Sequence, residues 1–455
     1  MLFHTPQFFL FLIATLALFY VSPKRLGKYV LLAASYFFYA TWNYKFLALL
    51  IALTAIDYTA GLWLERIPPG RRRKLVLILS LAANLSFLGF FKYFNFLAAN
   101  LALIAGRSGA LRLDVILPLG ISFHTFQSMS YVIDVYRGEQ QAVRNPLDYA
   151  LFICFFPQLV AGPIVRARDF FRDLWKWQRP SSGDVLHGLL LLVLGLTKKM
   201  AFADQFAAVA NGYFANVTGN PGMLTAWSGV IAFGLQIYFD FSGYTDMAIG
   251  MAKLLGFHFP INFRRPYLAG TVTEFWRRWH ISLSTWLRDY LYIPLGGNRG
   301  GRWRTYRNLM ITMLLGGLWH GASWNFVVWG GYQGALLSAE RALGIRRGYP
   351  FTVVTTFALQ MIGWVFFRSA DMGQSMAVLR QMFAPQLGHN LFTPWQIGLA
   401  LIALAAAVGE EYLEWFERIA RRPALAFASA ICGMLFLIEI FGVLDQAIPF
   451  IYFQF

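Results

Sequence analysis

Charged residues are scarce in this chain. Asp, Glu, Lys and Arg make up only 13% of its 455 residues, whereas 58% are hydrophobic and 18% are aromatic. A soluble protein carries about 25% charged residues, so the composition excludes an ordinary soluble protein and indicates an integral membrane protein. No Gly/Ser linker, long polar block or internal repeat divides the sequence. We therefore expect one all-α, polytopic membrane domain over residues 1–455.

The sequence also lacks the marks of a disulfide-stabilised or metal-binding protein. It has two cysteines, Cys154 and Cys432, far apart and each inside an apolar run. This excludes a disulfide framework and predicts no metal site. The first twenty residues contain no basic start and no small-residue cleavage site, and Lys24 follows them. That order predicts an uncleaved first membrane span.

Acidic residues are few: 22 against 39 basic ones, a net charge of +17. Nucleic-acid binding would explain such an excess in a soluble protein, but cytoplasmic loops of membrane proteins also collect Lys and Arg. We favour the second explanation and expect no nucleic-acid partner. Basic residues cluster at 24–28, 71–74, 166–172 and from 264 onward. All four clusters can share the cytoplasmic side, which predicts that the N-terminus lies outside. The loop with Arg341, Arg346 and Arg347 breaks this pattern.

Apolar segments recur from end to end. Several are shorter than the ~20 residues that a straight span needs, so we predict about eleven to thirteen transmembrane helices, with re-entrant or interfacial helices. The candidate spans are residues 6–22, 29–42, 46–64, 75–91, 93–106, 115–136, 149–165, 185–203, 224–251, 309–339, 351–367, 395–408 and 424–443.

One histidine lies inside the run 308–339, which contains no charged residue. At about 1.5 Å per helical residue, His320 would sit roughly 20 Å along this run, inside a hydrocarbon core about 30 Å thick. An ionisable group at that depth is costly and usually functional. Glycines around it, Gly316, Gly317 and Gly321, would leave room for a substrate. His320 is therefore the first candidate for a catalytic residue.

Residues 263–307 contain nine arginines and no lysine, with only Glu274 and Asp289 against them. A guanidinium offers phosphate a planar fork, so Arg277 and Arg278 are candidates for binding a phosphate-bearing donor. Topology signals alone would explain the charge but not the absence of lysine. At helical spacing Trp276 and His280 share one face of a helix that could lie at the membrane interface.

His280 is the second histidine of interest, although a lone histidine on an aromatic face is often a core residue. We expect structural roles for the other five histidines. A polar stripe from Gln236 to Asp246 also interrupts an apolar span. Its spacing pairs Gln236 with Asp240 and Ser242 with Asp246. Proton relay, hydroxyl binding and adhesion between helices all fit, and adhesion to neighbouring arginines or tyrosines is favoured.

Together these motifs resemble the membrane-bound O-acyltransferase family, in its bacterial branch that includes the membrane subunit of alginate O-acetyltransferase. The resemblance covers essentially the whole chain and is densest between Gln236 and Gly334, a catalytic core of about residues 236–335. It rests on Asn262–Tyr267, Phe275–Ser284, Leu318–Gly321, Pro118–Phe123, Tyr238–Asp246 and Pro449–Phe455.

The resemblance implies a ring of transmembrane helices around a thin core, with cytoplasmic and external funnels that meet at the family histidine. That histidine falls on His320, and the second polar residue falls on His280. Trp276, Trp279, Arg277, Arg278, Asp240 and Trp319 are then candidates for donor or substrate binding.

The resemblance also implies the reaction. An acyl group, expected to be acetyl, would pass from a cytoplasmic thioester, acetyl-CoA or an acyl carrier protein, to an exported polysaccharide such as alginate. The partner would be a periplasmic SGNH-type acetyltransferase or another polysaccharide-modifying protein. The chain itself would lie in the bacterial inner membrane and would hold no permanently bound cofactor.

Acyl transfer needs a general base, an oxyanion donor and exclusion of water. A neutral imidazole suits the first role, which we assign to His320; an acyl-histidine stays open. His280 or a backbone N–H near Gly316 and Gly317 could stabilise the oxyanion, an effect worth roughly 3–4 kcal/mol. The alternatives are a proton-coupled transporter or flippase, a structural scaffold, and D-alanyl transfer to a cell-wall polymer.

Overall fold

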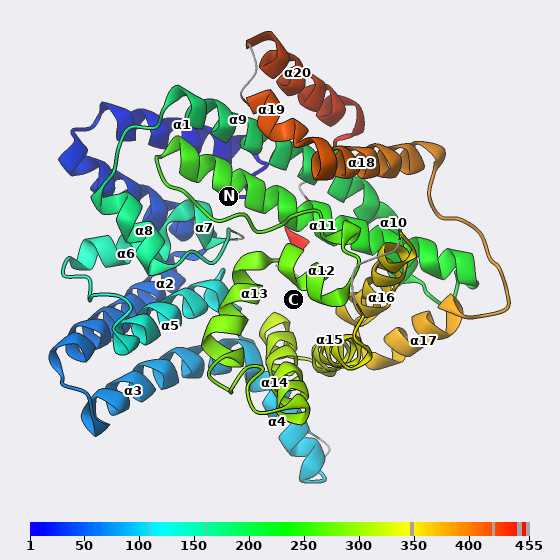
Figure 1. Cartoon of the computed structure of the whole chain (residues 1–455), viewed down its shortest axis with the longest axis horizontal. Helices are drawn as coiled ribbons and strands as arrows, with labels where there is room; N and C mark the ends of the chain where they lie inside the picture. The colour runs from blue at the N-terminus through cyan, green and yellow to red at the C-terminus, as the bar shows by residue number, and fades with distance from the viewer. Residues whose placement is uncertain (108, 161, 346–349, 421–423, 444–447, 452–455) are drawn as a thin grey trace. The chain divides into compact units, whose positions relative to one another are not determined.

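A computed structural model describes residues 1–455 except 108, 161, 346–349, 421–423, 444–447 and 452–455. Within these residues the secondary structure is helical and contains no strand, as expected (Figure 1). The first half contains α1 (Pro6–Val21), α2 (Lys24–Arg66), α3 (Arg71–Leu88), η1 (Gly89–Tyr93), α4 (Phe94–Ile104), α5 (Ile121–Arg137), α6 (Pro146–Cys154), α7 (Phe156–Leu159), α8 (Ala167–Trp175), α9 (Ser182–Thr197), η2 (Lys198–Ala203) and α10 (Asp204–Ala215).

The second half begins with the longest helix after α2. It contains α11 (Met223–Leu254), η3 (Pro266–Leu268), α12 (Val272–Arg278), α13 (Ile281–Leu287), η4 (Arg288–Tyr292), α14 (Arg302–His320), α15 (Trp324–Leu343), α16 (Pro350–Arg368), α17 (Met372–Met382), α18 (Pro394–Leu413), α19 (Trp415–Ala420) and α20 (Ala424–Phe441).

The described chain forms two compact units. Unit 1 comprises Met1–Gly188 and Ala248–Pro260, and unit 2 comprises Leu189–Met247 and Ile261–Phe455. Two of the three boundaries fall within α9 and α11, and the third lies in the segment after α11. In unit 1, buried Asp57 on α2 accepts hydrogen bonds from Ser80 and Asn84 on α3, at 2.7 and 2.8 Å. Both histidines of interest lie in unit 2. That the 455 residues act as one domain stays a prediction.

Several span boundaries differ from those predicted. The predicted spans 29–42 and 46–64 are one helix, α2, in which only Asn43 departs from helical geometry. Spans 75–91 and 93–106 are also continuous, through the π-turn η1. Conversely, α5 begins only at Ile121, after an irregular segment. In the described part of the predicted span 149–165 there are two short helices, α6, which begins earlier at Pro146, and α7.

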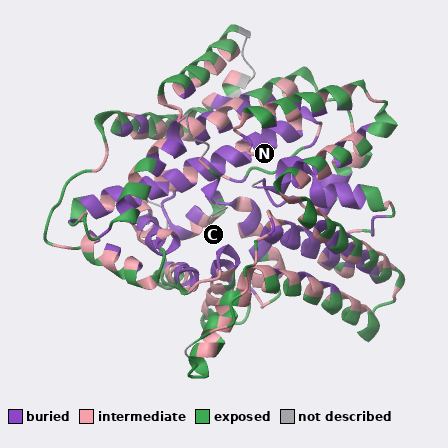
Figure 2. Ribbon diagram, turned by 180° about the vertical axis from the view of Figure 1, so that it is seen from behind, coloured by how far each residue is buried: buried purple, intermediate pink, exposed green. Residues whose placement is uncertain are grey.

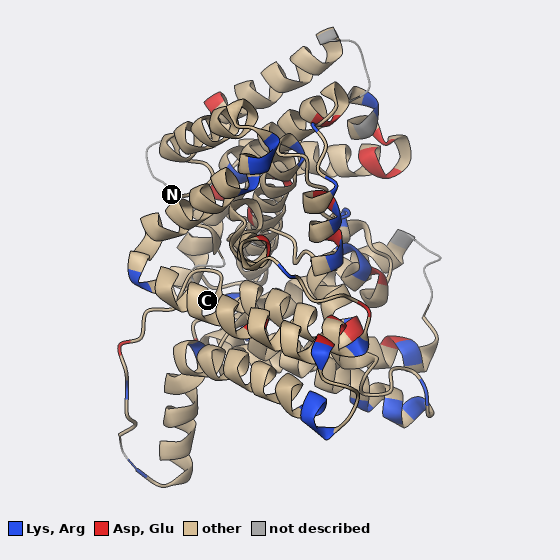
Figure 3. Cartoon of the chain, turned by 90° about the vertical axis from the view of Figure 1, so that its left-hand side faces the viewer, with Lys and Arg blue, Asp and Glu red and all other residues tan. Residues whose placement is uncertain are grey.

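Five helical segments of the described chain are long and apolar enough to cross a membrane: Lys24–Arg66, Arg71–Ile104, Ser182–Ala215, Phe351–Arg368 and Pro394–Leu413. Shorter apolar helices add Pro6–Val21 and Leu425–Phe441. The count of eleven to thirteen spans stays a prediction. Many helices carry an exposed face opposite a buried one (Figure 2), and Val21, Ile104 and Leu425 are among the exposed apolar side chains. Charged residues gather in clusters between long uncharged stretches (Figure 3).

Candidate functional site

His280 lies at a break between two short helices. The sequence predicted a helix through Trp276, His280 and Leu287, but α12 ends at Arg278 and α13 begins at Ile281. His280 itself adopts the left-handed conformation, with φ 42° and ψ 57°. The shared helical face predicted for Trp276 and His280 is therefore wrong. Left-handed geometry costs a non-glycine residue roughly 1–2 kcal/mol, so the surrounding structure must hold it.

Asn262 holds this turn. Its backbone carbonyl accepts a hydrogen bond from the Ile281 N–H at 2.9 Å. Its side-chain Oδ1 accepts from the backbone N–H and the hydroxyl of Ser282, at 3.1 and 2.9 Å. The first N–H groups of a helix need partners from outside the helix, and a residue eighteen positions before His280 supplies them. The Asn262–Tyr267 motif thus positions His280 through the backbone.

The His280 imidazole is fully buried in an aromatic environment. Phe241 from α11 meets it edge to face, with ring centroids 4.7 Å apart. Phe263 lies nearly parallel to it at 6.4 Å, and Trp319 from α14 is 6.1 Å away. The surroundings of this ring therefore exclude bulk water.

His320 is the last residue of α14. The predicted single span 309–339 is instead a helical hairpin, in which α14 ends at His320 and α15 begins at Trp324. A Cβ on Gly317 would lie 2.2 Å from the Phe326 carbonyl oxygen, and one on Gly330 would lie 2.3 Å from that of Met313. The glycines therefore allow α14 and α15 to touch backbone to backbone.

This packing corrects two expectations about the glycines. The space beside Gly321 is filled by the Phe326 ring, whose Cε2 would be 2.0 Å from an added Cβ. Gly317 and Gly321 thus serve the hairpin and leave no opening for a substrate. Gly316 and Gly317 also lie inside α14, so their N–H groups belong to the helical ladder and are not available to an oxyanion.

His320 is buried, with 5% of its surface exposed. Three rings surround its imidazole edge to face: Trp319 at 5.0 Å, Trp329 at 5.1 Å and Phe367 at 5.2 Å between centroids. Trp319 therefore contacts both His280 and His320. This single indole brings together two histidines that come from separate elements, forty residues apart.

The other two tryptophans of the site differ in their surroundings. Trp276 donates from Nε1 to Gln333 Oε1 at 3.2 Å and meets Trp329 edge to face at 5.8 Å. Trp279 is 1% exposed and lies among the rings of Phe275, Trp364 and Phe263 at 5.0–5.5 Å. Trp276 thus adjoins the His320 environment through Trp329, whereas Trp279 lies inside the aromatic core.

The adjacent arginines Arg277 and Arg278 differ in how far they are buried. Arg278 is buried and donates to both carboxylate oxygens of Glu411 at 3.1 and 2.9 Å. It also pairs with Glu274 at 2.7 Å, and Glu411 in turn accepts from Arg265 at 2.7 Å. Burial alone would lower the pKa of Arg278, but Glu411 and Glu274 outweigh it and raise the pKa above its usual value. Arg277 is exposed.

Asp240 belongs to a buried ionic cluster on the polar stripe of α11. Lys199 Nζ lies 2.9 Å from Asp240 and 2.7 Å from Asp204. The Ile451 N–H donates to the other Asp240 oxygen at 2.6 Å. Lys198 pairs with Asp246 at 2.6 Å. The sequence predicted arginine or tyrosine as the partners of Asp240 and Asp246. For these ion pairs that prediction is wrong, because both carboxylates pair with lysines of η2.

Lys198 and Lys199 were missed in the sequence. They stand inside the apolar segment 185–203, and an adjacent pair of ionisable residues there was the available signal. The last four residues of the Pro449–Phe455 motif, together with Arg346 and Arg347 of the exceptional loop, lie outside the described residues. Within the described chain, no group of three His, Cys, Asp or Glu side chains is placed to bind a metal ion.

Comparison with known proteins adds an independent finding. The model of the membrane-bound O-acyltransferase family, MBOAT, matches residues 76–383, which include both histidines. A "Probable alginate O-acetylase AlgI" of Pseudomonas syringae pv. tomato is 45% identical over 414 residues, covering 87% of this chain and 79% of the relative. A "Peptidoglycan O-acetyltransferase" of Helicobacter pylori is 40% identical, covering 84% of this chain and 80% of the relative. A "Teichoic acid D-alanyltransferase" of Bacillus subtilis is 31% identical but covers 48% and 58%.

Proposed function

Because this chain belongs to the membrane-bound O-acyltransferase family, we propose that it takes an acetyl group from a thioester donor and passes it to an acceptor hydroxyl, so that a periplasmic partner can acetylate an exported polysaccharide. It is a multi-pass membrane protein and an acyltransferase, which removes the transporter and scaffold alternatives. The observation that carries the proposal is the contact of Trp319 with both His280 and His320 in a buried aromatic site.

In the proposed reaction, His320 is the general base. It takes the proton of the acceptor hydroxyl while that oxygen attacks the thioester carbon, and the proton then passes to the departing thiolate as the C–S bond breaks. The products are an ester and a free thiol. His280, as a neutral imidazole, donates a hydrogen bond to the oxyanion. With the backbone N–H groups of Gly316 and Gly317 engaged in α14, His280 is the preferred oxyanion donor.

We propose acetyl-CoA as the donor, with an acyl carrier protein as its competitor. Both bring phosphate or an acidic surface to the arginine-rich stretch 263–307, where Arg277 is exposed. We propose that the chain lies in the bacterial inner membrane with its N-terminus outside, and that a periplasmic SGNH-type transferase completes the transfer to the polymer. The polymers in the relatives' names, alginate and peptidoglycan, support a glycan polymer as the final acceptor.

D-alanyl transfer is the second candidate. The D-alanyltransferase relatives align over about half of this chain, whereas the acetyltransferase relatives align over more than four fifths. That difference favours acetyl as the acyl group.

The test is thioester consumption by the purified chain in proteoliposomes, followed as free thiol release. Acetyl-CoA should be consumed when a polysaccharide acceptor or the periplasmic partner is present, and the His320→Ala protein is the matched control. Release of thiol only from a D-alanyl carrier protein would replace acetyl transfer by alanylation. Equal release by the variant would remove His320 from the reaction.

The orientation is tested separately, in a chain without Cys154 and Cys432. Single cysteines in the loop 71–74 and near Arg302 should react only from the cytoplasmic side, and one at Thr5 only from outside. The opposite accessibility would invert the proposed donor and acceptor sides.

A further inference from the structure

Unit 1 contains a basic pocket of about 540 Å³. Four of its lining side chains are cationic and, among the described lining residues, none is acidic. The lining consists of Phe19, Tyr20, Ser22, Lys24, Arg25, Gly27, Lys28, Tyr29, Leu31, Leu174, Trp177, Arg179 and Phe257. Nothing in the acyl-transfer chemistry assigns a role to this pocket.

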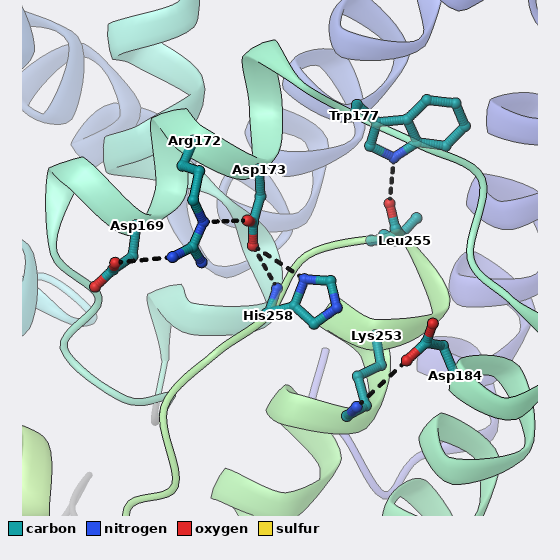
Figure 4. Close-up of polar contacts among 8 residues, drawn as sticks. All are labelled: Asp169, Arg172, Asp173, Trp177, Asp184, Lys253, Leu255 and His258. Atoms are coloured by element: carbon teal, nitrogen blue, oxygen red, sulfur yellow. Dashed lines mark hydrogen bonds and ion pairs between the residues drawn. The ribbon is translucent and has the colours of Figure 1, made fainter.

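The aromatic wall of the pocket is fixed in place. Trp177 donates from Nε1 to the Leu255 carbonyl at 2.8 Å (Figure 4), and Tyr20 donates to that of Leu254. Gly256, with φ +82°, permits this approach, since a Cβ there would lie 2.7 Å from Trp177 Nε1. The wall is therefore a built surface, held by the carbonyls at the end of α11.

The cations are placed against these rings. Lys24 Nζ lies 5.9 Å from the centroid of Trp177, and the Arg179 guanidinium lies 5.3 Å from that of Tyr20. Lys28 pairs with Asp148 at 2.6 Å, but no ion pair to a carboxylate is recorded in the described chain for Lys24, Arg25 or Arg179. Three positive charges thus converge on one pocket without a carboxylate to neutralise them.

We propose that this pocket binds the phosphate of an anionic phospholipid headgroup. Arginine offers phosphate a planar fork and lysine a point charge, and Ser22 adds a hydroxyl. Exposed apolar side chains adjoin the lining residues along the chain, Leu18 before Phe19, Val21 before Ser22 and Leu26 after Arg25, where acyl chains could lie. Basic pockets beside membrane helices suit anionic headgroups. This inference does not depend on the acyl-transfer proposal.

The test uses the full chain in detergent, titrated with dioleoylphosphatidylglycerol and followed by native mass spectrometry. The pocket variant combines Lys24→Gln, Arg25→Gln and Arg179→Gln. Its matched control, Arg71→Gln with Arg72→Gln and Lys74→Gln, removes three exposed charges at the start of α3. Each charge near an anionic surface is worth about a fivefold change in affinity. The pocket variant should therefore bind at least about tenfold more weakly, while the control changes less than about twofold.

A second variant, which leaves the charge of the pocket unchanged, tests the proposal if the triple variant folds poorly. Trp177→Phe removes the hydrogen bond to Leu255 and weakens the ring under Lys24, so it should also reduce phosphatidylglycerol binding. Equal losses in the pocket and α3 variants would overturn the site in favour of general surface charge. Equal binding of phosphatidylcholine, or full displacement by inorganic phosphate or coenzyme A, would overturn its assignment to a lipid headgroup.

Discussion

Arg278 donates two hydrogen bonds to the carboxylate of Glu411, at 3.1 and 2.9 Å. Its neighbour Arg277 is exposed. Two arginines that look equivalent in the sequence therefore have different surroundings: one belongs to a carboxylate network, and the other is accessible to a ligand. The donor-binding hypothesis accordingly narrows to Arg277.

Replacing Arg278 by Lys should destabilise the protein. Lysine keeps the charge but cannot make the two-pronged contact with Glu411 while also reaching Glu274, so at least one charged hydrogen bond is lost. Such bonds contribute about 1.5–3 kcal/mol each. A lower thermal midpoint in detergent would be the readout, with the KM for the donor unchanged in the protein that remains folded. A raised KM at unchanged stability would instead return Arg278 to the donor site.

Replacing Arg277 by Lys should change donor binding and leave the stability of the protein unchanged. The thermal midpoint should stay constant, and the KM for acetyl-CoA should rise by roughly tenfold with little change in kcat, since the planar fork for phosphate is lost. Arg112→Lys, at an exposed arginine outside the stretch 263–307, is the matched control. If both variants behave like the unmodified protein, the arginines serve topology alone.

His320→Ala should abolish acyl transfer without preventing membrane insertion. General-base catalysis supplies about 10²–10⁴-fold, and the thiol-release assay measures this directly. Since three rings pack against the imidazole, a stability measurement must accompany it, and His320→Gln, closer in size, is the packing control. Activity above about a tenth in a well-folded variant would contradict the base assignment.

His280 has a conformational role that can be separated from a chemical one. At an ordinary helical position Gly is about 1 kcal/mol worse than Ala, but the left-handed φ of 42° should reverse this order. His280→Gly should therefore be at least as stable as His280→Ala, while both lose about 10²–10³-fold in kcat if the imidazole serves the oxyanion. Near-normal turnover in the Gly variant would mean that only the turn matters.

Composition and apolar runs were enough to predict an all-helical membrane protein, because those signals are local. The break at Trp279–His280 was not predictable in the same way. No glycine or proline marks it. The break is held by hydrogen bonds that the N–H groups of Ile281 and Ser282 donate to Asn262, eighteen residues before His280. Helical periodicity cannot register a tertiary contact of this kind.

The site was partly predictable. An isolated histidine in an uncharged run made His320 a catalytic candidate, and that role stays a prediction; its position at the tip of a hairpin was not foreseen. Lys199 escaped attention, since a basic residue near a span end resembles a topology signal. Only the fold places it 2.9 Å from Asp240. Likewise, Glu410 and Glu411 follow an apolar span in the sequence. Only the fold shows that they form ion pairs with Arg265 and Arg278.

The backbone contact between α14 and α15 limits how the site can move. Where Gly317 meets the Phe326 carbonyl and Gly330 meets that of Met313, no layer of side chains lies between the helices to let one slide along the other. His320 must therefore be displaced together with the first turns of α15, as one rigid body. A change in the spacing of the two histidines during turnover would therefore have to involve the α12–α13 turn, which hydrogen bonds to Asn262 hold.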